Sequence, residues 1–89
     1  MRIHVVVRGR VQGVGFRWFV REMGKRLDLA GWVRNRADGS VEVAAEGDDV
    51  SIDHLRRALH RGPDGATVKS VDDVTGSSEL LPKPFTVLT

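Results

Sequence analysis

The 89-residue chain has no cysteine, which excludes a disulfide framework, a thiolate metal site and a cysteine nucleophile. Long apolar runs are also missing, since the longest, Val5–Val7, is far shorter than a membrane span of about 18 residues. The N-terminus lacks the apolar segment of a signal peptide. We therefore expect a cytoplasmic protein with no membrane partner.

The composition is otherwise ordinary, with 40% hydrophobic and 29% charged residues. Such a chain is too apolar for disorder and too mixed for a fibre. A domain of this size buries about 60–68% of its unfolded surface, so we expect residues 1–89 to form one domain with a single core between two layers. The small size and the lack of a long apolar surface favour a monomer.

Charge is unevenly distributed along the chain. Residues 1–36 carry nine basic and two acidic side chains, whereas residues 37–89 carry five basic and ten acidic ones. A basic half indicates an anionic partner such as a phosphate, a nucleic acid or an acidic surface. The alternative is a solvated basic face with no partner.

Hydrophobic spacing predicts the order strand-helix-strand-strand-helix-strand, followed by a short terminal strand. This order is typical of the ferredoxin-like split-βαβ sandwich, an α+β fold in which a largely antiparallel sheet carries both helices on one face. The fold hosts enzymes, RNA-binding modules and metal carriers, so it does not indicate a function by itself. The predicted elements are strand 2–9, a helix over 16–27, strands 31–35 and 41–45, a helix capped at Asp48 or Asp49 and ended by Gly62-Pro63, and strands 67–74 and 84–88.

Local signals add three expectations to this outline. Asp38-Gly39 predicts a hairpin turn between the second and third strands. Gly24 costs the first helix about 1 kcal/mol relative to alanine unless close packing requires a glycine there. Val68, Val71 and Val74 are spaced by three and so are out of strict alternation, which predicts a bulge in the fourth strand.

The loop between the first strand and the first helix is the stretch most informative about function. Gly9, Gly13 and Gly15 allow successive N–H groups to turn inward, and the following helix N-terminus adds free N–H groups and a favourable dipole. Arg17 lies at the junction, where its planar guanidinium could bind two oxygens of a phosphoryl group. The loop predicts a cradle for a small tetrahedral anion. The alternative is a tight turn beside a solvated arginine.

Better-known phosphate-binding loops do not fit this stretch. A Walker loop would have lysine and serine or threonine where the chain has Phe16-Arg17, and a dinucleotide fingerprint would have glycine in place of Trp18. A phosphatase loop that forms phosphocysteine would need cysteine at Val11. The predicted cradle therefore belongs to none of these three classes of phosphate-binding loop.

Asn35 is the second candidate, near the end of a predicted strand. Its amide can hold a water with the oxygen and donate to a phosphoryl oxygen with the nitrogen, but it cannot take a proton. The alternative is an ordinary residue at the edge of a hairpin.

At these two stretches the sequence resembles the acylphosphatase family. The signature Val-Gln-Gly-Val-x-Phe-Arg is matched from Val11 to Arg17, and Gly-Trp-Val-x-Asn is matched at 31–35, followed by Gly-x-Val at 39–41. The resemblance covers the whole chain and implies the same ferredoxin-like fold. One departure is Gly24, where the family often has alanine.

The resemblance implies an acylphosphatase that hydrolyses the carboxyl-phosphate bond of acyl phosphates to a carboxylate and inorganic phosphate, without metal, cofactor or covalent intermediate. Arg17 and the loop N–H groups would bind the phosphoryl group, and Asn35 would position the attacking water. A carboxylate leaves without a general acid, and a phosphate oxygen of the substrate could accept the water's proton. The cradle residues implied are Val11, Gln12, Gly13, Val14, Gly15 and Phe16. Surrounding arginines could steer the substrate, namely Arg8, Arg10, Arg34 and Arg36.

Other classes of function have less support. An RNA-binding module would display aromatic side chains on its central strands, but the predicted strands 3–7 and 41–45 have none, so we expect no nucleic-acid partner. Acylphosphatase-like domains also begin a larger hydrogenase-maturation carbamoyltransferase. Since nothing follows Thr89, we expect a free-standing protein. His4, His54 and His60 lack metal-ligand spacing, which predicts surface or structural roles and no metal site.

Overall fold

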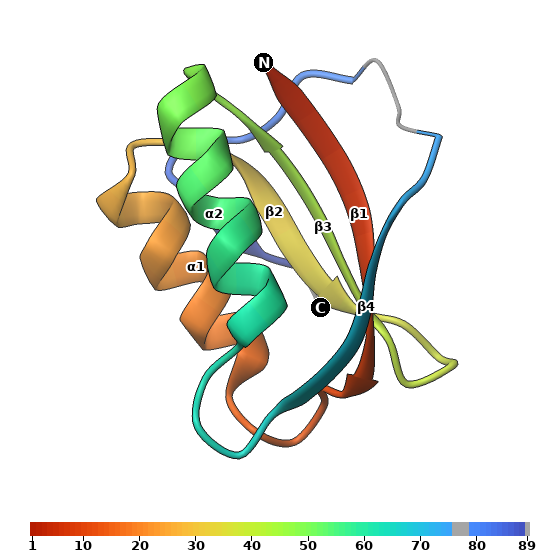
Figure 1. Ribbon diagram of the computed structural model, residues 1–89. Helices are drawn as coiled ribbons and strands as arrows, with labels where there is room; N and C mark the ends of the chain where they lie inside the picture. The colour runs from red at the N-terminus through yellow and green to blue at the C-terminus, as the bar shows by residue number, and fades with distance from the viewer. Residues whose placement is uncertain (76–78, 89) are drawn as a thin grey trace.

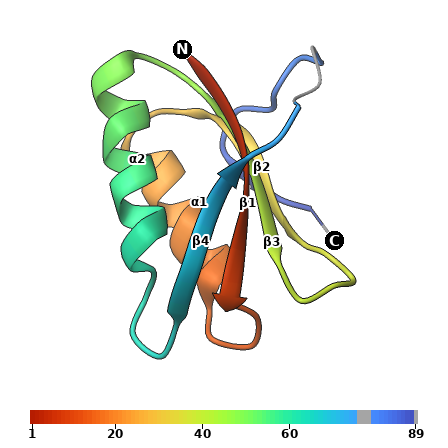
Figure 2. The same ribbon diagram turned by 45° about the vertical axis from the view of Figure 1, so that its right-hand side comes forward.

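A computed structural model describes residues 1–75 and 79–88 of the chain (Figure 1). A five-stranded sheet carries both helices on one face, as Figures 1 and 2 show from two directions. This arrangement confirms the predicted ferredoxin-like sandwich. The elements are β1 (Arg2–Arg10), α1 (Phe16–Arg26), β2 (Ala30–Asn35), β3 (Val41–Glu46), α2 (Asp49–Arg61), β4 (Thr67–Asp73) and β5 (Thr86–Val87). The last strand is shorter than the predicted 84–88, since Pro84, Phe85 and Leu88 lie outside it.

The strand order across the sheet is β4-β1-β3-β2-β5. β3 pairs antiparallel with both β1 and β2, and β4 pairs antiparallel with β1. Only β5 runs parallel to its neighbour, which is β2. Since β1 and β2 are both antiparallel to β3, they run in the same direction and end at the same edge of the sheet.

The predicted bulge in β4 is confirmed. Arg8 pairs with Ser70 and Gly9 pairs with Val68, so Lys69 is the extra residue opposite this step. The extra residue allows Val68 and Val71, which are three positions apart, to pack against the same core.

The main core lies between the sheet and the helices. Side chains alternate along a strand, so every second residue of β1, β2 and β3 faces the apolar stripes of the helices. A smaller cluster on the opposite face groups Trp32 with Ala44 and Leu81. The main core contains Ile3, Val5, Val7, Val11, Phe16, Val20, Leu29, Val33, Val41, Val43, Ala45, Ile52, Leu55, Leu59 and Phe85.

The second helix begins and ends as its sequence predicts. Asp48 is the N-cap of α2, and its carboxylate accepts a hydrogen bond from the Ser51 N–H at 2.7 Å. This bond lowers the pKa of the Asp48 carboxyl. Gly62 forms the C-cap with a φ of 69°. Within residues 1–75 and 79–88, neither helix has the length and apolarity needed to cross a bilayer.

Gly24 is buried in α1 where the Phe85 side chain packs against the helix. A Cβ atom at position 24 would lie 3.0 Å from Phe85 Cβ and closer still to the ring. Phe85 is only 2% exposed and belongs to the main core. Close packing therefore requires glycine at this position.

Replacing Gly24 with alanine tests this packing. The methyl group would add helix propensity worth about 1 kcal/mol. Overpacking against Phe85 costs about 1–3 kcal/mol, so we expect a net loss of stability in urea denaturation. The double variant Gly24→Ala/Phe85→Ala removes Cγ and the ring, which lie nearest to the added methyl group, so Gly24→Ala should cost less in that background. A gain of stability from Gly24→Ala alone would contradict the account.

Candidate active site

The glycine-rich loop and Asn35 meet at one edge of the sheet. The loop leaves β1 at the edge where β2 also ends, and Asn35 is the last residue of β2. Both line a pocket of about 310 Å³ together with Arg17. Six of the residues singled out in the sequence share this pocket, namely Val11, Gly13, Gly15, Phe16, Arg17 and Asn35. Gln12 and Val14 are not part of its lining.

The backbone of the loop needs glycine at two positions. Gly13 and Gly15 have φ angles of 75° and 78°, in the left-handed region that other residues rarely adopt. A Cβ atom at either position would meet no atom within 4 Å, so the backbone angle and not lack of space requires glycine.

The N-terminus of α1 has hydrogen-bond donors that the helix itself does not use. The first bond within this turn joins the Phe19 N–H to the Gly15 carbonyl at 3.0 Å, which leaves the N–H groups of residues 16–18 without a partner inside the helix. No side chain in the described part of the protein caps α1, and its first turn has no acidic residue. Since α2 does receive a carboxylate cap, the two helix starts differ in what they offer an anion.

The charged side chains of the pocket are basic. Arg17 is exposed in the first turn of α1 and makes no hydrogen bond or ion pair with another described residue. Arg21 lines the same pocket and pairs with Glu22 at 3.1 Å. Among the described residues that line the pocket, none is acidic. The pocket therefore attracts an anion.

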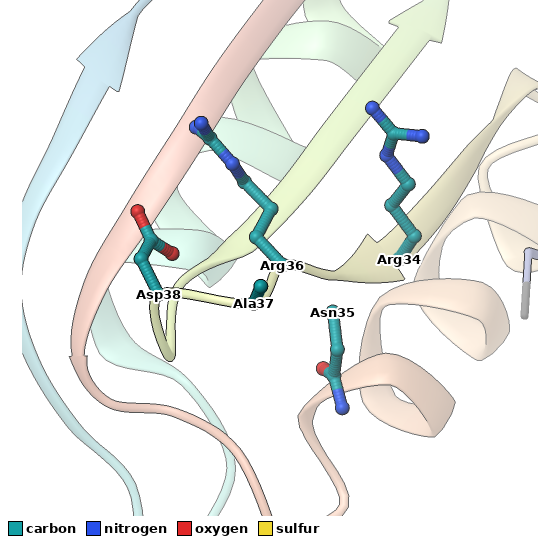
Figure 3. Close-up of a pocket in the computed structure, with 5 residues that line it drawn as sticks. All are labelled: Arg34, Asn35, Arg36, Ala37 and Asp38. Atoms are coloured by element: carbon teal, nitrogen blue, oxygen red, sulfur yellow. The ribbon is translucent and has the colours of Figure 1, made fainter.

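The Asn35 side chain points toward the start of α1, as Figure 3 shows. Alternation along β2 places it on the helix-covered face with Val33, whereas Arg34 and Arg36 project away from it (Figure 3). The Asn35 Oδ1 is buried and has no hydrogen-bond partner in the described part of the chain. Leaving a buried acceptor without a hydrogen bond lowers the stability of the fold by about 1–3 kcal/mol. Because this oxygen has no partner among the described residues, it is available to a donor from outside the fold.

Two of the arginines expected to steer a substrate are already paired. Arg34 lies 5.2 Å from the Trp32 ring centroid and binds Glu42 Oε1 at 2.7 Å. Arg8 lies within 3.4 Å of Asp38 and 3.5 Å of Asp72. These contacts reduce the positive charge that either arginine presents to an approaching anion.

Glu42 is also the partner of His4, one of the three histidines. His4 Nε2 lies 2.5 Å from Glu42 Oε2, and both side chains are nearly buried. Burial alone would raise the pKa of Glu42, but hydrogen bonds from His4 and Arg34 hold it below the ordinary value. His4 thus has a structural partner, as expected. No group of three or more potential metal ligands occurs among residues 1–75 and 79–88.

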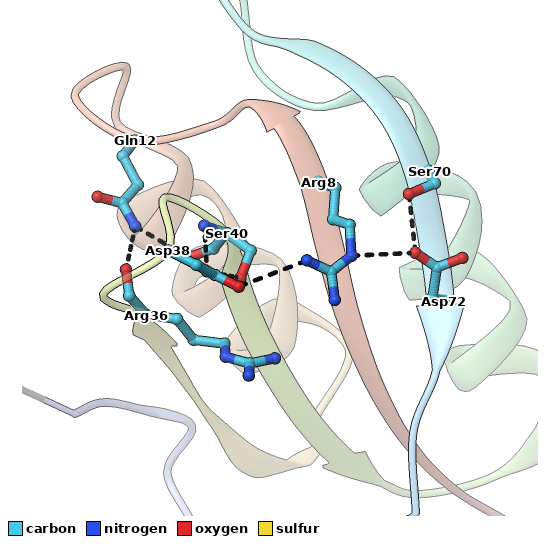
Figure 4. Close-up of polar contacts among 7 residues, drawn as sticks. All are labelled: Arg8, Gln12, Arg36, Asp38, Ser40, Ser70 and Asp72. Atoms are coloured by element: carbon cyan, nitrogen blue, oxygen red, sulfur yellow. Dashed lines mark hydrogen bonds and ion pairs between the residues drawn. The ribbon is translucent and has the colours of Figure 1, made fainter.

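Gln12 joins the loop to the hairpin that follows Asn35. Its Nε2 donates to the carbonyl oxygens of Arg36 and Ser40 at 2.8 and 2.9 Å, as Figure 4 shows. The sequence predicts a place in the cradle for the Gln12 backbone but does not indicate this role of the side chain. The two carbonyl groups belong to residues 24 and 28 positions further along the chain, so no local sequence pattern indicates these hydrogen bonds.

The hairpin turn is held by Asp38. Its Oδ1 accepts hydrogen bonds from the Ser40 N–H at 2.9 Å and the Ser40 hydroxyl at 2.5 Å (Figure 4). These bonds, from the hydroxyl above all, lower the pKa of Asp38 to about 2.

Three other pocket residues were given no site role by the sequence, namely Trp18, Arg21 and Val87. Trp18 lines the pocket and is 60% exposed, although it is a large aromatic residue. Its position outside the apolar stripe of α1 was the available signal. Val87 comes from β5, far away in the chain, and had none.

Comparison with known proteins agrees with the resemblance to the acylphosphatase family. The family model described as Acylphosphatase matches residues 3–85. An acylphosphatase of Salinibacter ruber is 51% identical over 71 residues, which are 80% of this chain and 75% of that protein. An acylphosphatase of Rhizobium etli is 44% identical over 85 residues, 96% of this chain and 90% of that protein. The crystal structure of acylphosphatase from Bacillus subtilis has a TM-score of 0.84 at 36% identity, and the match covers 99% of this chain and 98% of that one.

Removing the Ser40 hydroxyl tests the electrostatics of the turn. In Ser40→Ala the backbone bond to Asp38 remains, so we expect the Asp38 pKa to rise part of the way from about 2 toward 3.8. A carboxyl whose pKa is lowered by folding stabilises the fold above its unfolded pKa, and that contribution is lost as the pH falls toward 2. As the pH falls from 3.8 toward 2, the free energy of unfolding of Ser40→Ala should therefore decrease less than that of the native chain.

A carbon-13 NMR titration of the Asp38 carboxyl measures the shift. Ser70→Ala is the matched control, because it removes a hydroxyl bonded to Asp72 at 2.8 Å and leaves Asp38 untouched. An unchanged titration midpoint in Ser40→Ala would refute the assigned cause.

Proposed function

The chain belongs to the acylphosphatase family and is an enzyme that hydrolyses acyl phosphates; we propose that it does so in the pocket between the Val11–Gly15 loop and Asn35. The observation that carries this proposal is the buried, unpartnered Oδ1 of Asn35, a residue that lines the same pocket as Arg17 and the uncapped start of α1. One pocket thus combines an anion site with an acceptor suited to a water molecule.

In this proposal the phosphoryl group of the substrate occupies the cradle. The N–H groups of the loop and of the first turn of α1 donate to its oxygens, and the helix dipole favours its negative charge. Arg17 can add two parallel hydrogen bonds from its guanidinium. Since no other described residue engages this side chain, it can bind the substrate without breaking a contact of the fold.

Asn35 places the attacking water. Its Oδ1 accepts a hydrogen bond from the water, and its Nδ2 can donate to a phosphoryl oxygen, so one amide aligns the two reacting groups. The water oxygen forms a bond to phosphorus as the bond from phosphorus to the acyl oxygen breaks. The products are a carboxylate and inorganic phosphate.

Neither a general base nor a general acid from the protein is needed. An amide cannot take the proton of the water, so the proton passes to a phosphoryl oxygen of the substrate. The departing carboxylate is stable as an anion. Catalysis then rests on positioning and on stabilisation of the phosphoryl charge by Arg17 and the backbone, without metal, cofactor or covalent intermediate.

All groups invoked in this reaction come from one chain. The loop, Arg17 and Asn35 lie in a single pocket of the sandwich. This supports the further proposal that residues 1–89 form one domain that acts as a monomer on a small-molecule substrate.

Arg17→Ala should lower kcat/KM for benzoyl phosphate by about a hundred- to a thousandfold, the effect of losing one preorganised donor to a developing charge. Arg17→Lys should also be strongly impaired, because an ammonium cannot reproduce the planar fork. Thermal unfolding should be unchanged, since Arg17 has no partner among the described residues. Arg57→Ala removes an equal charge, paired with Asp53 on α2, and serves as the control. Near-normal hydrolysis by Arg17→Ala would refute the assignment.

Asn35→Ala should lower kcat by about a hundredfold or more while the inhibition constant of inorganic phosphate stays within a few-fold. Stability should be equal or slightly higher, because the substitution removes a buried acceptor that lacks a partner. Steady-state kinetics with phosphate as competitor, together with thermal unfolding, measure all three quantities. Weakened phosphate binding with unchanged kcat would contradict the role of Asn35 in placing the water.

A further inference from the structure

We propose that the Gln12 side chain is a positioning residue, which holds the phosphate cradle and Asn35 at the separation that the reaction requires. The inference rests on the proposed function, because it concerns the two halves of that site. It assigns Gln12 a role distinct from its backbone's place in the loop.

The first observation is the pair of atoms that Gln12 joins. Its Nε2 donates to the Arg36 carbonyl at 2.8 Å and to the Ser40 carbonyl at 2.9 Å (Figure 4). Arg36 directly follows Asn35, and Ser40 directly precedes β3. One amide group therefore binds both sides of the β2–β3 hairpin at its mouth, next to the residue that places the water.

The second observation is that the hairpin end of this link is firmly held. The Arg36 N–H donates to the Ser40 carbonyl at 2.9 Å, and Asp38 accepts two hydrogen bonds from Ser40. Ser40 is buried although it is polar. Gln12 is thus attached to a part of the hairpin that has other bonds to keep it in place.

The third observation is that no other side-chain hydrogen bond links the loop to the hairpin among the described residues. Gly13 and Gly15 are exposed and have no side chain to pack, whereas half-buried Val14 between them packs against the main core. Buried Val11 secures the start of the loop, and α1 secures its end. Among the described residues, Gln12 is the one member of the loop whose side chain hydrogen-bonds to the hairpin.

Small changes in the relative position of the cradle and Asn35 should affect the reaction rate strongly. A misplacement of about 1 Å between reacting groups can cost a hundredfold in rate. The cradle sets the position of phosphorus and Asn35 sets the position of the water, so their relative placement determines the line of attack. Phosphate binding depends mainly on the cradle and should be much less sensitive to Gln12.

The test is a double-mutant cycle on kcat for benzoyl phosphate, with Gln12→Met, Asn35→Ala and the double variant. Methionine keeps the length of the side chain and removes the donor. We expect Gln12→Met to lower kcat about 10- to 100-fold in the native background and less than threefold in the Asn35→Ala background. The inhibition constant of inorganic phosphate should change less than threefold in Gln12→Met.

A purely structural role predicts a different pattern. Val71→Ala removes core contacts in β4 and serves as a control that lowers stability at a distance from the pocket. It should lower the melting temperature and leave kcat unchanged, whereas Gln12→Met should lower kcat at temperatures where it is fully folded. Gln12→Ala, studied in parallel, provides a second variant without the donor and should show the same coupling to Asn35→Ala.

The inference is overturned if Gln12→Met leaves kcat unchanged, or if it lowers kcat by the same factor with and without Asn35. If instead Asn35→Ala itself retains native kcat, the proposed function fails at the water-placing residue. The two failures are distinguishable, because the second appears in the single variant that does not touch Gln12.

Discussion

The position of β3 between β1 and β2 is the constraint on which the site depends. Because β3 is antiparallel to both neighbours, the other two strands run in the same direction and end at the same edge of the sheet. That edge brings the loop after β1 close to Asn35 at the end of β2, although the two are far apart in the chain. The apolar alternation of the strands, which forms the core, also turns Asn35 toward α1 and its neighbours Arg34 and Arg36 away (Figure 3).

The residues of the candidate site lack stabilising contacts that comparable positions elsewhere in the fold have. α2 begins with an aspartate cap, whereas α1 begins at a left-handed glycine with no side-chain cap. Arg17 makes no hydrogen bond or ion pair with another described residue, and the Asn35 Oδ1 is buried without a partner in the described part of the chain. Each of these features is unfavourable or neutral for folding alone. Together they leave a set of donors, a positive charge and an acceptor available to a phosphoryl group and a water, which is the pattern expected of a functional site.

Much of the fold could be predicted from the sequence because its signals are local. The valine spacing of β4 indicated the bulge, Asp48 indicated the start of α2, and the glycines indicated a loop with left-handed angles. The contacts that could not be predicted join distant parts of the chain. Gln12 bonds to a hairpin more than twenty residues away, and Phe85 explains a glycine in α1 that helix propensity disfavours. Such partners depend on the sheet order, which no single stretch of sequence contains.

The central claim is that the loop and the uncapped start of α1 bind the phosphoryl group beside Asn35. Titrating the nitrogen-15-labelled protein with inorganic phosphate, and following the amide resonances by NMR, tests this claim most directly. The account predicts that the largest shifts occur at the backbone N–H groups of Gly13 to Trp18 and at the side chains of Arg17 and Asn35. Shifts confined to the pocket on the Arg34 and Arg36 side, or no saturable shift in the loop, would contradict it.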